Sequence, residues 1–389
     1  MQRKTLHKQY KKLGISAVRR IGFSFFAVIL IGSILLSLPM SHSVHSTSSY
    51  LDHLFVATSA TCVTGLVTHV TASEYTLFGQ IVIILLIQIG GLGFLTLMSM
   101  FFVLLKRKLT YANKIVMQEA LNRNSLNETG IYIKRVIKYT VCFELIGAIC
   151  LAFVFIPQFG ILKGIYYSLF HAISAFCNAG FDLFGVSLIN YQSDWIVLST
   201  TMLLIIFGGL GFVVWSDFFD HGLKFKKYEL HSKIVLVFNG IIILVPAIFY
   251  FIFEFTNFGN AGKFTYLPFN EKILNALFLS VSPRTAGFNS LDLNNLTSSG
   301  KLLTMVLMFI GGSTGSTAGG VKVTTIVVVI ANLVSLARGK DKIVLFKRRV
   351  NNNIVKQSSA LVLAYLIITI ISTLVICAIE PNVMFESVL

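Results

Sequence analysis

The chain has 389 residues, of which 55% are hydrophobic and only 12% are charged, and its mean hydropathy is +0.79. Soluble globular proteins carry about twice that share of charged residues. The composition, with its 34 phenylalanines, therefore excludes an ordinary soluble protein and indicates that lipid is the main solvent.

The net charge of +16 raises the question of a nucleic-acid partner, and the positions of the charges answer it. Most of the 32 lysines and arginines lie in four segments, 1–20, 106–138, 224–233 and 338–356. The loops between the apolar segments on the other side contain only Lys163, Lys263, Lys272 and Arg284. This alternation follows the positive-inside rule, so we expect a multi-pass plasma-membrane protein with a cytoplasmic N-terminus. The basic segments then face membrane lipid and cytosolic partners, and no nucleic acid is expected.

Spanning helices are predicted where about 20 nearly uncharged residues follow one another, because that length crosses roughly 30 Å of hydrocarbon. In chain order these stretches are 21–38, 76–105, 139–156, 196–215, 234–253, 302–310 together with 323–336, and 358–379.

A repeated motif lies between these stretches. The three copies are Leu54–Leu66, Leu169–Phe181 and Leu277–Phe288, and each leads from a Leu-Phe pair to a glycine. A paired-glycine motif follows each copy inside the next apolar stretch, beginning at Gly90, Gly208 and Gly311. Two signatures recurring in the same order predict a repeated unit of spanning helix, short helix, glycine turn and second spanning helix.

The chain thus divides into repeats and basic linkers. The predicted parts are a basic N-terminus at 1–20, repeat 1 at 21–105, a linker at 106–138, repeat 2 at 139–219, a linker at 220–233, repeat 3 at 234–337, a linker at 338–357 and a partial repeat 4 at 358–389. Residues 383–389 are similar to the start of a fourth short helix, whose glycine would lie beyond Leu389. We therefore expect the chain to be truncated in its fourth repeat.

The glycine turns are the predicted ion site. Backbone carbonyls from convergent loops replace the hydration shell of a cation without any fixed charge, and glycine allows the required backbone angles. The predicted segments are Thr61, Cys62, Val63, Thr64 and Gly65, then Cys177, Asn178, Ala179 and Gly180, and then Arg284, Thr285, Ala286 and Gly287. They contain no carboxylate, which argues against a divalent cation.

The motifs T-C-V-T-G-L, F-C-N-A-G-F and P-R-T-A-G-F-N, followed by G-G-S-T-G-S-T-A-G-G, resemble the Trk/Ktr/HKT superfamily of potassium transporters. The likeness is greatest to the membrane subunit of bacterial Ktr systems. It implies an all-α membrane protein with four M1-P-M2 pore-loop repeats in a pseudo-fourfold arrangement, the fourth incomplete here. It also implies potassium as the transported ion, with Gly65 favouring potassium over sodium, and leaves sodium stimulation open.

The resemblance further implies that the second helix of repeat 3 is broken by an intramembrane loop that obstructs the pore and moves on activation. The predicted gating loop consists of Gly311, Gly312, Ser313, Thr314, Gly315, Ser316, Thr317, Ala318, Gly319 and Gly320. Its five glycines each disfavour a helix by about 1 kcal/mol relative to alanine. The alternative is a small-residue helix-packing face. At Gly90 and Gly208 packing is the preferred interpretation.

Partners follow from the same resemblance, which implies a homodimer on a cytoplasmic ring of nucleotide-binding regulatory subunits. No organic cofactor is expected, since the chain has no Walker motif. Two alternatives stay open: a secondary transporter of another small ion or solute, and a non-conducting fragment. An enzyme is disfavoured, because the G-x-S-x-G match at Gly311–Gly315 has no histidine after it.

Four single residues have structural alternatives. His171 is interpreted as a packing or hydrogen-bonding residue, and Arg284 as a residue that binds carbonyls behind its loop. Glu144 lies inside a predicted span, where an ionisable group is costly, and a functional and a structural role are equally supported. Lys322 follows the gating loop and either biases gating or caps backbone carbonyls.

Overall fold

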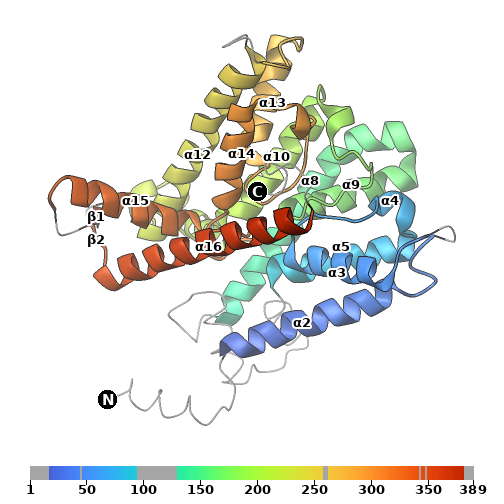
Figure 1. The fold of residues 1–389 in the computed structure, drawn as a ribbon, viewed down its shortest axis with the longest axis horizontal. Coiled ribbons are helices and arrows are strands. Elements are labelled where there is room, and N and C mark those ends of the chain that lie inside the picture. Colours follow the sequence, from blue (N-terminus) through green and yellow to red (C-terminus); the bar gives the residue numbers. More distant parts are fainter. Residues whose placement is uncertain are drawn as a thin grey trace.

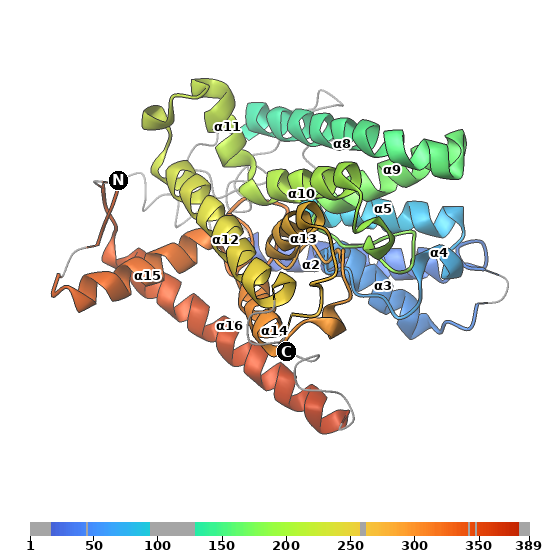
Figure 2. The ribbon, with the colours of Figure 1, turned by 90° about the horizontal axis from the view of Figure 1, so that it is seen from above.

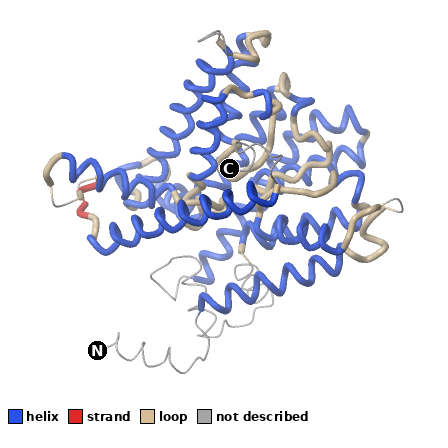
Figure 3. The backbone as a smooth tube through the Cα atoms, in the orientation of Figure 1, coloured by secondary structure: helices blue, strands red, loops and turns tan. Residues whose placement is uncertain are grey.

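The computed structural model describes residues 17–43, 46–93, 129–256, 262–340, 343–346 and 348–380, and helices dominate this part of the chain (Figures 1 and 3). The N-terminus before residue 17, the end of the first repeat after residue 93, most of the 106–138 linker and the start of the fourth short helix at 383–389 lie outside the described residues.

The predicted repeat is visible as a recurring order: a first helix, a second helix of 13 to 16 residues that ends at a glycine turn, and further apolar helices after that turn. Repeat 1 contains α2 (Ala17–Leu36), α3 (Tyr50–Cys62), the single turn α4 (Thr71–Glu74) and α5 (Leu77–Leu92). Repeat 2 contains α8 (Thr129–Phe159), α9 (Ile161–Phe176), α10 (Trp195–Leu210) and α11 (Phe212–His221), so α8 begins inside the predicted 106–138 linker and α11 ends just after residue 219. Repeat 3 contains α12 (Leu230–Phe255), α13 (Phe269–Val281), α14 (Ser298–Phe309) and α15 (Val323–Ala337). The last described helix is α16 (Asn352–Ile379), so the predicted fold class is confirmed.

In each repeat one helix after the glycine turn, namely α5, α10 or α14, begins at a polar side chain that caps its backbone. Thr76 Oγ1 accepts from Gly79 N–H at 3.4 Å, and Thr297 Oγ1 accepts from Gly300 N–H at 3.1 Å. Asp194 Oδ1 accepts from two backbone donors of the first turn of α10. Such caps pair donors that have no partner within the helix, and they fix where each helix starts after its loop.

Three described helices are long and apolar enough to cross a membrane, namely 134–159, 230–255 and 352–379. A fourth span results if α10 and α11 are counted together, although they are bent by 92° at Gly211. The sequence predicted a span at 196–215, and the structure breaks this stretch at Gly211. Gly211 has φ of 89°, a left-handed value that an α-helix cannot continue through. Four shorter apolar helices, 22–36, 77–92, 298–309 and 323–337, complete this set.

The main hydrophobic core joins the first two repeats and reaches the short helix of the third. Helices α5, α8, α9 and α10 run side by side in Figure 2, with α13 next to α10. Fully buried phenylalanines concentrate where the short helices end, and they include Phe170, Phe176, Phe181, Phe278 and Phe288. Outward faces are also apolar; Phe153 on α8, for example, is 72% exposed. Apolar faces on both sides of the helices suit a protein surrounded by lipid.

One small sheet is present in the described part of the chain. Strand β1 (Val344–Leu345) pairs antiparallel with β2 (Arg348–Arg349). The hairpin lies between the end of α15 and the start of α16, where Ile343 and Val350 pack with Val328 and Val355 (Figure 1).

Candidate functional site

The three glycine turns share one backbone conformation. In each turn the glycine has a positive φ, 82° at Gly65, 74° at Gly180 and 80° at Gly287. The residue two positions earlier is also left-handed, with φ of 58° at Val63, 58° at Asn178 and 68° at Thr285. Side chains rarely adopt such angles, so their recurrence at the same position indicates a common constraint.

The end of each short helix holds its turn in place. Backbone N–H groups turn back to serine carbonyls, from Thr64 to Ser59 at 2.8 Å, from Ala179 to Ser174 at 2.8 Å and from Ala286 to Ser282 at 3.0 Å. The hydroxyls of Ser174 and Ser282 donate to the carbonyls of Phe181 and Phe288, just beyond each glycine. The turns are therefore closed by the residues that precede and follow them.

The carbonyl groups inside the turns have no such partners. Within the described residues, no donor bonds the carbonyl oxygens of Val63, Thr64, Asn178, Ala179, Thr285 or Ala286. Ala179 and Ala286 are fully buried. Buried carbonyls are nearly always hydrogen-bonded in proteins, so the carbonyls of Ala179 and Ala286 in particular need water or a cation as their partner.

The three turns lie against one another. A Cβ atom added to Gly65 would lie 2.4 Å from the carbonyl oxygen of Ala179, and one added to Gly180 would lie 2.6 Å from that of Ala286. At Gly287 it would lie 3.3 Å from the Cα of Gly180. The glycines thus satisfy two requirements at once, a left-handed backbone and a close approach between repeats.

The paired glycines of α5 and α10 allow the ends of the short helices α3 and α9 to pack closely against them. A Cβ added to Gly90 would lie 2.1 Å from the carbonyl oxygen of Thr61, and one added to Gly208 would lie 1.9 Å from that of Phe176. The predicted packing role of both glycines agrees with this geometry, because no side chain fits there.

The segment between α14 and α15 is a non-helical loop, and it lies where the resemblance implies a broken helix. Its flanks meet in a bridge between Ile310 and Val321. The loop is attached to the end of α10: Ser313 N–H donates to the Gly209 carbonyl at 3.0 Å, and Thr317 N–H donates to the Gly208 carbonyl at 3.3 Å. The break after α10 supplies a donor in return, from the first residue of α11 to the Gly315 carbonyl at 2.9 Å.

The loop also contacts two of the glycine turns. The Thr317 hydroxyl donates to the carbonyl of Phe176 at 2.9 Å and accepts from Asn178 Nδ2 at 3.2 Å. The backbone N–H of Gly319 donates to Thr285 Oγ1 at 3.2 Å. A shift of the loop must therefore break bonds to the second and third turns.

Lys322 and Arg284 bind oxygen atoms next to the loop and the third turn. Lys322 Nζ donates to the carbonyl of Ala318 at 2.7 Å, which is the carbonyl cap considered from the sequence. Arg284 is buried, and its Nη1 donates to Asn239 Oδ1 of α12 at 2.6 Å. Its partner is thus a side chain of the neighbouring helix rather than the expected backbone carbonyls. Asn239 was not singled out from the sequence, where it is one polar residue in an apolar stretch.

His171 and Glu144 are both buried behind the second turn. The two ring nitrogens of His171 contact the Tyr167 carbonyl at 2.7 Å and the Leu183 N–H at 3.3 Å, which agrees with the predicted hydrogen-bonding role. Glu144 accepts from Gln88 Nε2 at 3.0 Å. The other end of the same amide accepts from the thiol of Cys177 at 3.4 Å.

Comparison with known proteins bears on this arrangement. A family model described as TrkH, cation transport protein, matches residues 21–389. The potassium/sodium uptake protein NtpJ of Enterococcus hirae is 38% identical over 376 residues, which cover 97% of this chain and 82% of that protein. The chain belongs to the TrkH family of cation transport proteins. Ktr system potassium uptake protein B of Bacillus subtilis is also 38% identical, over 87% of this chain and 75% of its own length.

Solved structures agree with the fold of this TrkH-family chain. The crystal structure of the potassium transporter TrkH from Vibrio parahaemolyticus has a TM-score of 0.69 and 18% identity, covering 92% of this chain and 72% of that one. Membership in the TrkH family confirms the resemblance stated from the motifs, and it identifies a multi-pass membrane transport protein rather than an enzyme.

Two features of the TrkH-family site were not predicted. The left-handed residue before each glycine is valine, asparagine or threonine, so no common letter marks it. The bend at Gly211 was not predicted either. The motif Gly-Gly-Leu-Gly at 208–211 is a signal for it, because the same motif at 90–93 also ends its helix: Gly93 follows α5 with φ of 78°.

Proposed function

We propose that the chain translocates potassium across the plasma membrane through a filter built from the carbonyls of 61–65, 177–180 and 284–287. The observation that carries the proposal is the set of turn carbonyls that no described donor bonds. Such oxygens can coordinate a dehydrated cation and replace the water molecules of its hydration shell. The absence of a carboxylate from these segments favours a monovalent ion, and the names of the Enterococcus and Bacillus relatives favour potassium.

The loop from Gly311 to Gly320 is proposed to be the gate. Its bonds to the second and third turns support this role, because they connect it directly to the filter segments. In this proposal Lys322 both caps the loop and biases it, since its cation is held at the loop's cytoplasmic end by the Ala318 carbonyl.

The assembly belongs to the same proposal. We propose a homodimer with a cytoplasmic N-terminus, repeat boundaries at 21–105, 139–219 and 234–337, and a cytoplasmic ring of nucleotide-binding regulatory subunits. The distribution of lysine and arginine supports the orientation, and the Ktr system named in the Bacillus relative supports the regulatory partner. Sodium stimulation is included, on the support of the relative named for potassium and sodium uptake.

The ion ratio of a filter variant tests the proposal. Gly65→Ser places a side chain where a Cβ would lie 2.4 Å from the Ala179 carbonyl, so we expect it to lower potassium uptake relative to sodium uptake about ten-fold or more, corresponding to about 1.4 kcal/mol of lost preference. Uptake is measured with both ions in a bacterial strain that lacks its own potassium transporters.

Gly160→Ser is the matched control. Gly160 also has φ of 82°, but an added Cβ meets no atom within 4 Å and the residue lies before α9, away from the turns. The control should keep the wild-type ion ratio. An unchanged ratio in Gly65→Ser at normal expression, or uptake of another solute with no dependence on potassium, would contradict the proposed filter.

A further inference from the structure

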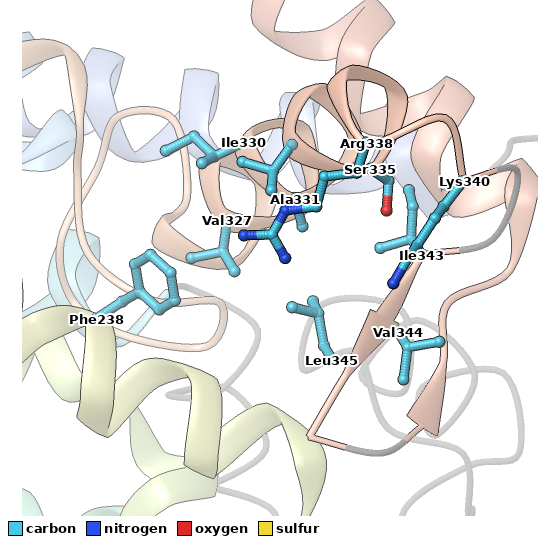
Figure 4. Close-up of a pocket in the computed structure, with 11 residues that line it drawn as sticks. Phe238, Val327, Ile330, Ala331, Ser335, Arg338, Lys340, Ile343, Val344 and Leu345 are labelled. Atoms are coloured by element: carbon cyan, nitrogen blue, oxygen red, sulfur yellow. The ribbon is translucent and has the colours of Figure 1, made fainter.

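A cavity of about 290 Å³ lies between α12, α15 and the β1–β2 hairpin, well separated in the chain from the glycine turns (Figure 4). Its walls are largely apolar, formed by Phe238, Val327, Ile330, Ala331, Val334 and Leu345. Ligand pockets are commonly of this size and are lined by apolar side chains with a few polar groups that fix the orientation of the ligand.

Two cationic side chains, Arg338 and Lys340, line this cavity. Figure 4 shows the guanidinium of Arg338 reaching into the open space between Val327 and Leu345, and the ammonium of Lys340 pointing toward the same space. Among the described residues, no acidic side chain lines the cavity. Neither Arg338 nor Lys340 takes part in any of the ion pairs formed by the described residues.

The combination defines the chemistry of a ligand. An apolar wall binds hydrocarbon, and two cations that no described carboxylate pairs bind an anion, so the complementary molecule is an amphiphile with an anionic head. A soluble anion would leave the apolar wall unused, and a neutral lipid would leave the two cations unpaired.

The position of the cavity indicates the source of that amphiphile. It lies at the end of an apolar helix, at the beginning of the basic 338–357 segment. Under the proposed orientation this is the cytoplasmic surface, where basic pockets between membrane helices face anionic headgroups. We propose that the cavity binds one anionic phospholipid of the cytoplasmic leaflet, with its phosphate between Arg338 and Lys340 and its first acyl carbons against α15. The choice of leaflet rests on the proposed function, whereas the binding does not.

Such a lipid would extend the existing contact between the hairpin and α15. It would lie against the hairpin on one side and against α15 on the other, and α15 is the helix that follows the loop of repeat 3. Occupancy therefore provides a physical link between the composition of the inner leaflet and the position of α15.

The test is lipid binding by the full chain, purified in an uncharged detergent and followed by native mass spectrometry. It is titrated separately with phosphatidylglycerol and phosphatidylcholine of identical acyl chains. We expect one phosphatidylglycerol to be retained in preference to phosphatidylcholine. Arg338→Gln with Lys340→Gln should weaken phosphatidylglycerol binding about thirty-fold, since each cation near a lipid surface contributes a factor of about five.

The control is Arg348→Gln with Arg349→Gln, which removes two exposed cations of the same hairpin that do not line the cavity. It should bind phosphatidylglycerol as the wild type does. Val334→Trp fills the cavity from an exposed position on α15 and should weaken binding while leaving the two cations in place. The double glutamine variant thus tests the contribution of the two charges, and Val334→Trp tests the contribution of the apolar wall.

Four outcomes would overturn the proposal. They are equal retention of the two lipids by the wild type, an equal loss in the control pair and the cavity pair, full displacement of the lipid by millimolar glycerol phosphate, and a second copy of the chain occupying the surface with no lipid bound. Because the readout is binding alone, it is independent of whether the chain transports potassium.

Discussion

Thr317→Val removes the hydroxyl that joins the intramembrane loop to the second glycine turn. The hydroxyl donates to the Phe176 carbonyl at 2.9 Å and accepts from Asn178 Nδ2 at 3.2 Å. Valine keeps the shape of the side chain but makes neither bond, so the amide of Asn178 and the carbonyl of Phe176 both lose a partner. If the loop obstructs the pathway in this position, the substitution favours its displaced form.

The magnitude follows from the two bonds. A hydrogen bond in a folded protein contributes about 1 kcal/mol net, so the loss of two shifts the equilibrium of the loop by about 2 kcal/mol. That shift changes the ratio of displaced to docked loops about thirty-fold. We therefore expect basal potassium flux to rise by up to about thirty-fold, while the ion ratio, which the proposed filter would set, stays close to that of the wild type.

Flux is measured as potassium uptake into proteoliposomes that contain the purified protein at equal amounts. Thr201→Val is the matched control, because Thr201 is a buried threonine of α10 whose hydroxyl, among the described residues, bonds the Val197 carbonyl of its own helix and no other atom. Its flux should equal that of the wild type. Equal flux in Thr317→Val and the wild type, with both proteins folded, would refute the idea that these bonds hold the loop closed.

Two further predictions concern stability. Asn239→Leu removes the side-chain partner of buried Arg284, so the free energy of unfolding should fall by about 2 kcal/mol and the thermal midpoint of the purified protein should fall with it; an unchanged midpoint would show that the 2.6 Å bond contributes nothing. At Glu74 burial opposes ionisation, but hydrogen bonds from the hydroxyls of Ser46 and Ser48 bring its pKa below the ordinary 4.5. A lowered pKa stabilises the fold above pH 4.5, and this stabilisation is lost as the pH falls through the lower pKa of the folded state. The thermal midpoint of Glu74→Gln should therefore depend less on pH below 4.5 than the thermal midpoint of the wild type.

Much of the architecture was predictable because it depends on the pattern of apolar side chains and on the positions of glycine. The three copies that lead from Leu-Phe to glycine predicted the three short helices. The paired glycines predicted where other helices pack against the short helices, since at Gly90 and Gly208 only glycine fits. Apolar length and the distribution of lysine and arginine predicted the long helices. These signals are periodic, and each recurs three times, so that every repeat supports the interpretation of the others.

The remainder depends on contacts that no local pattern carries. Arg284 could be placed next to its turn, but its bond to Asn239 joins residues 45 positions apart on different helices. The hydroxyl of Thr317 reaches a carbonyl 141 residues earlier. The left-handed backbone at Val63 is imposed by the closure of its turn rather than by valine itself, which disfavours it. Tertiary structure determines these features, so the sequence alone does not predict them.

The attachment of the loop to α10 has a consequence for how variants of this chain are interpreted. Three of its bonds connect main-chain atoms only, at Gly208, Gly209 and Gly315. Substitutions other than proline keep these main-chain donors, so the three bonds survive changes of side-chain chemistry, whereas the bond from the Ser313 hydroxyl to the Leu210 carbonyl does not. Two proteins whose residues differ at every non-glycine position here can therefore hold their loops in the same way, and a comparison of their aligned letters would not reveal it.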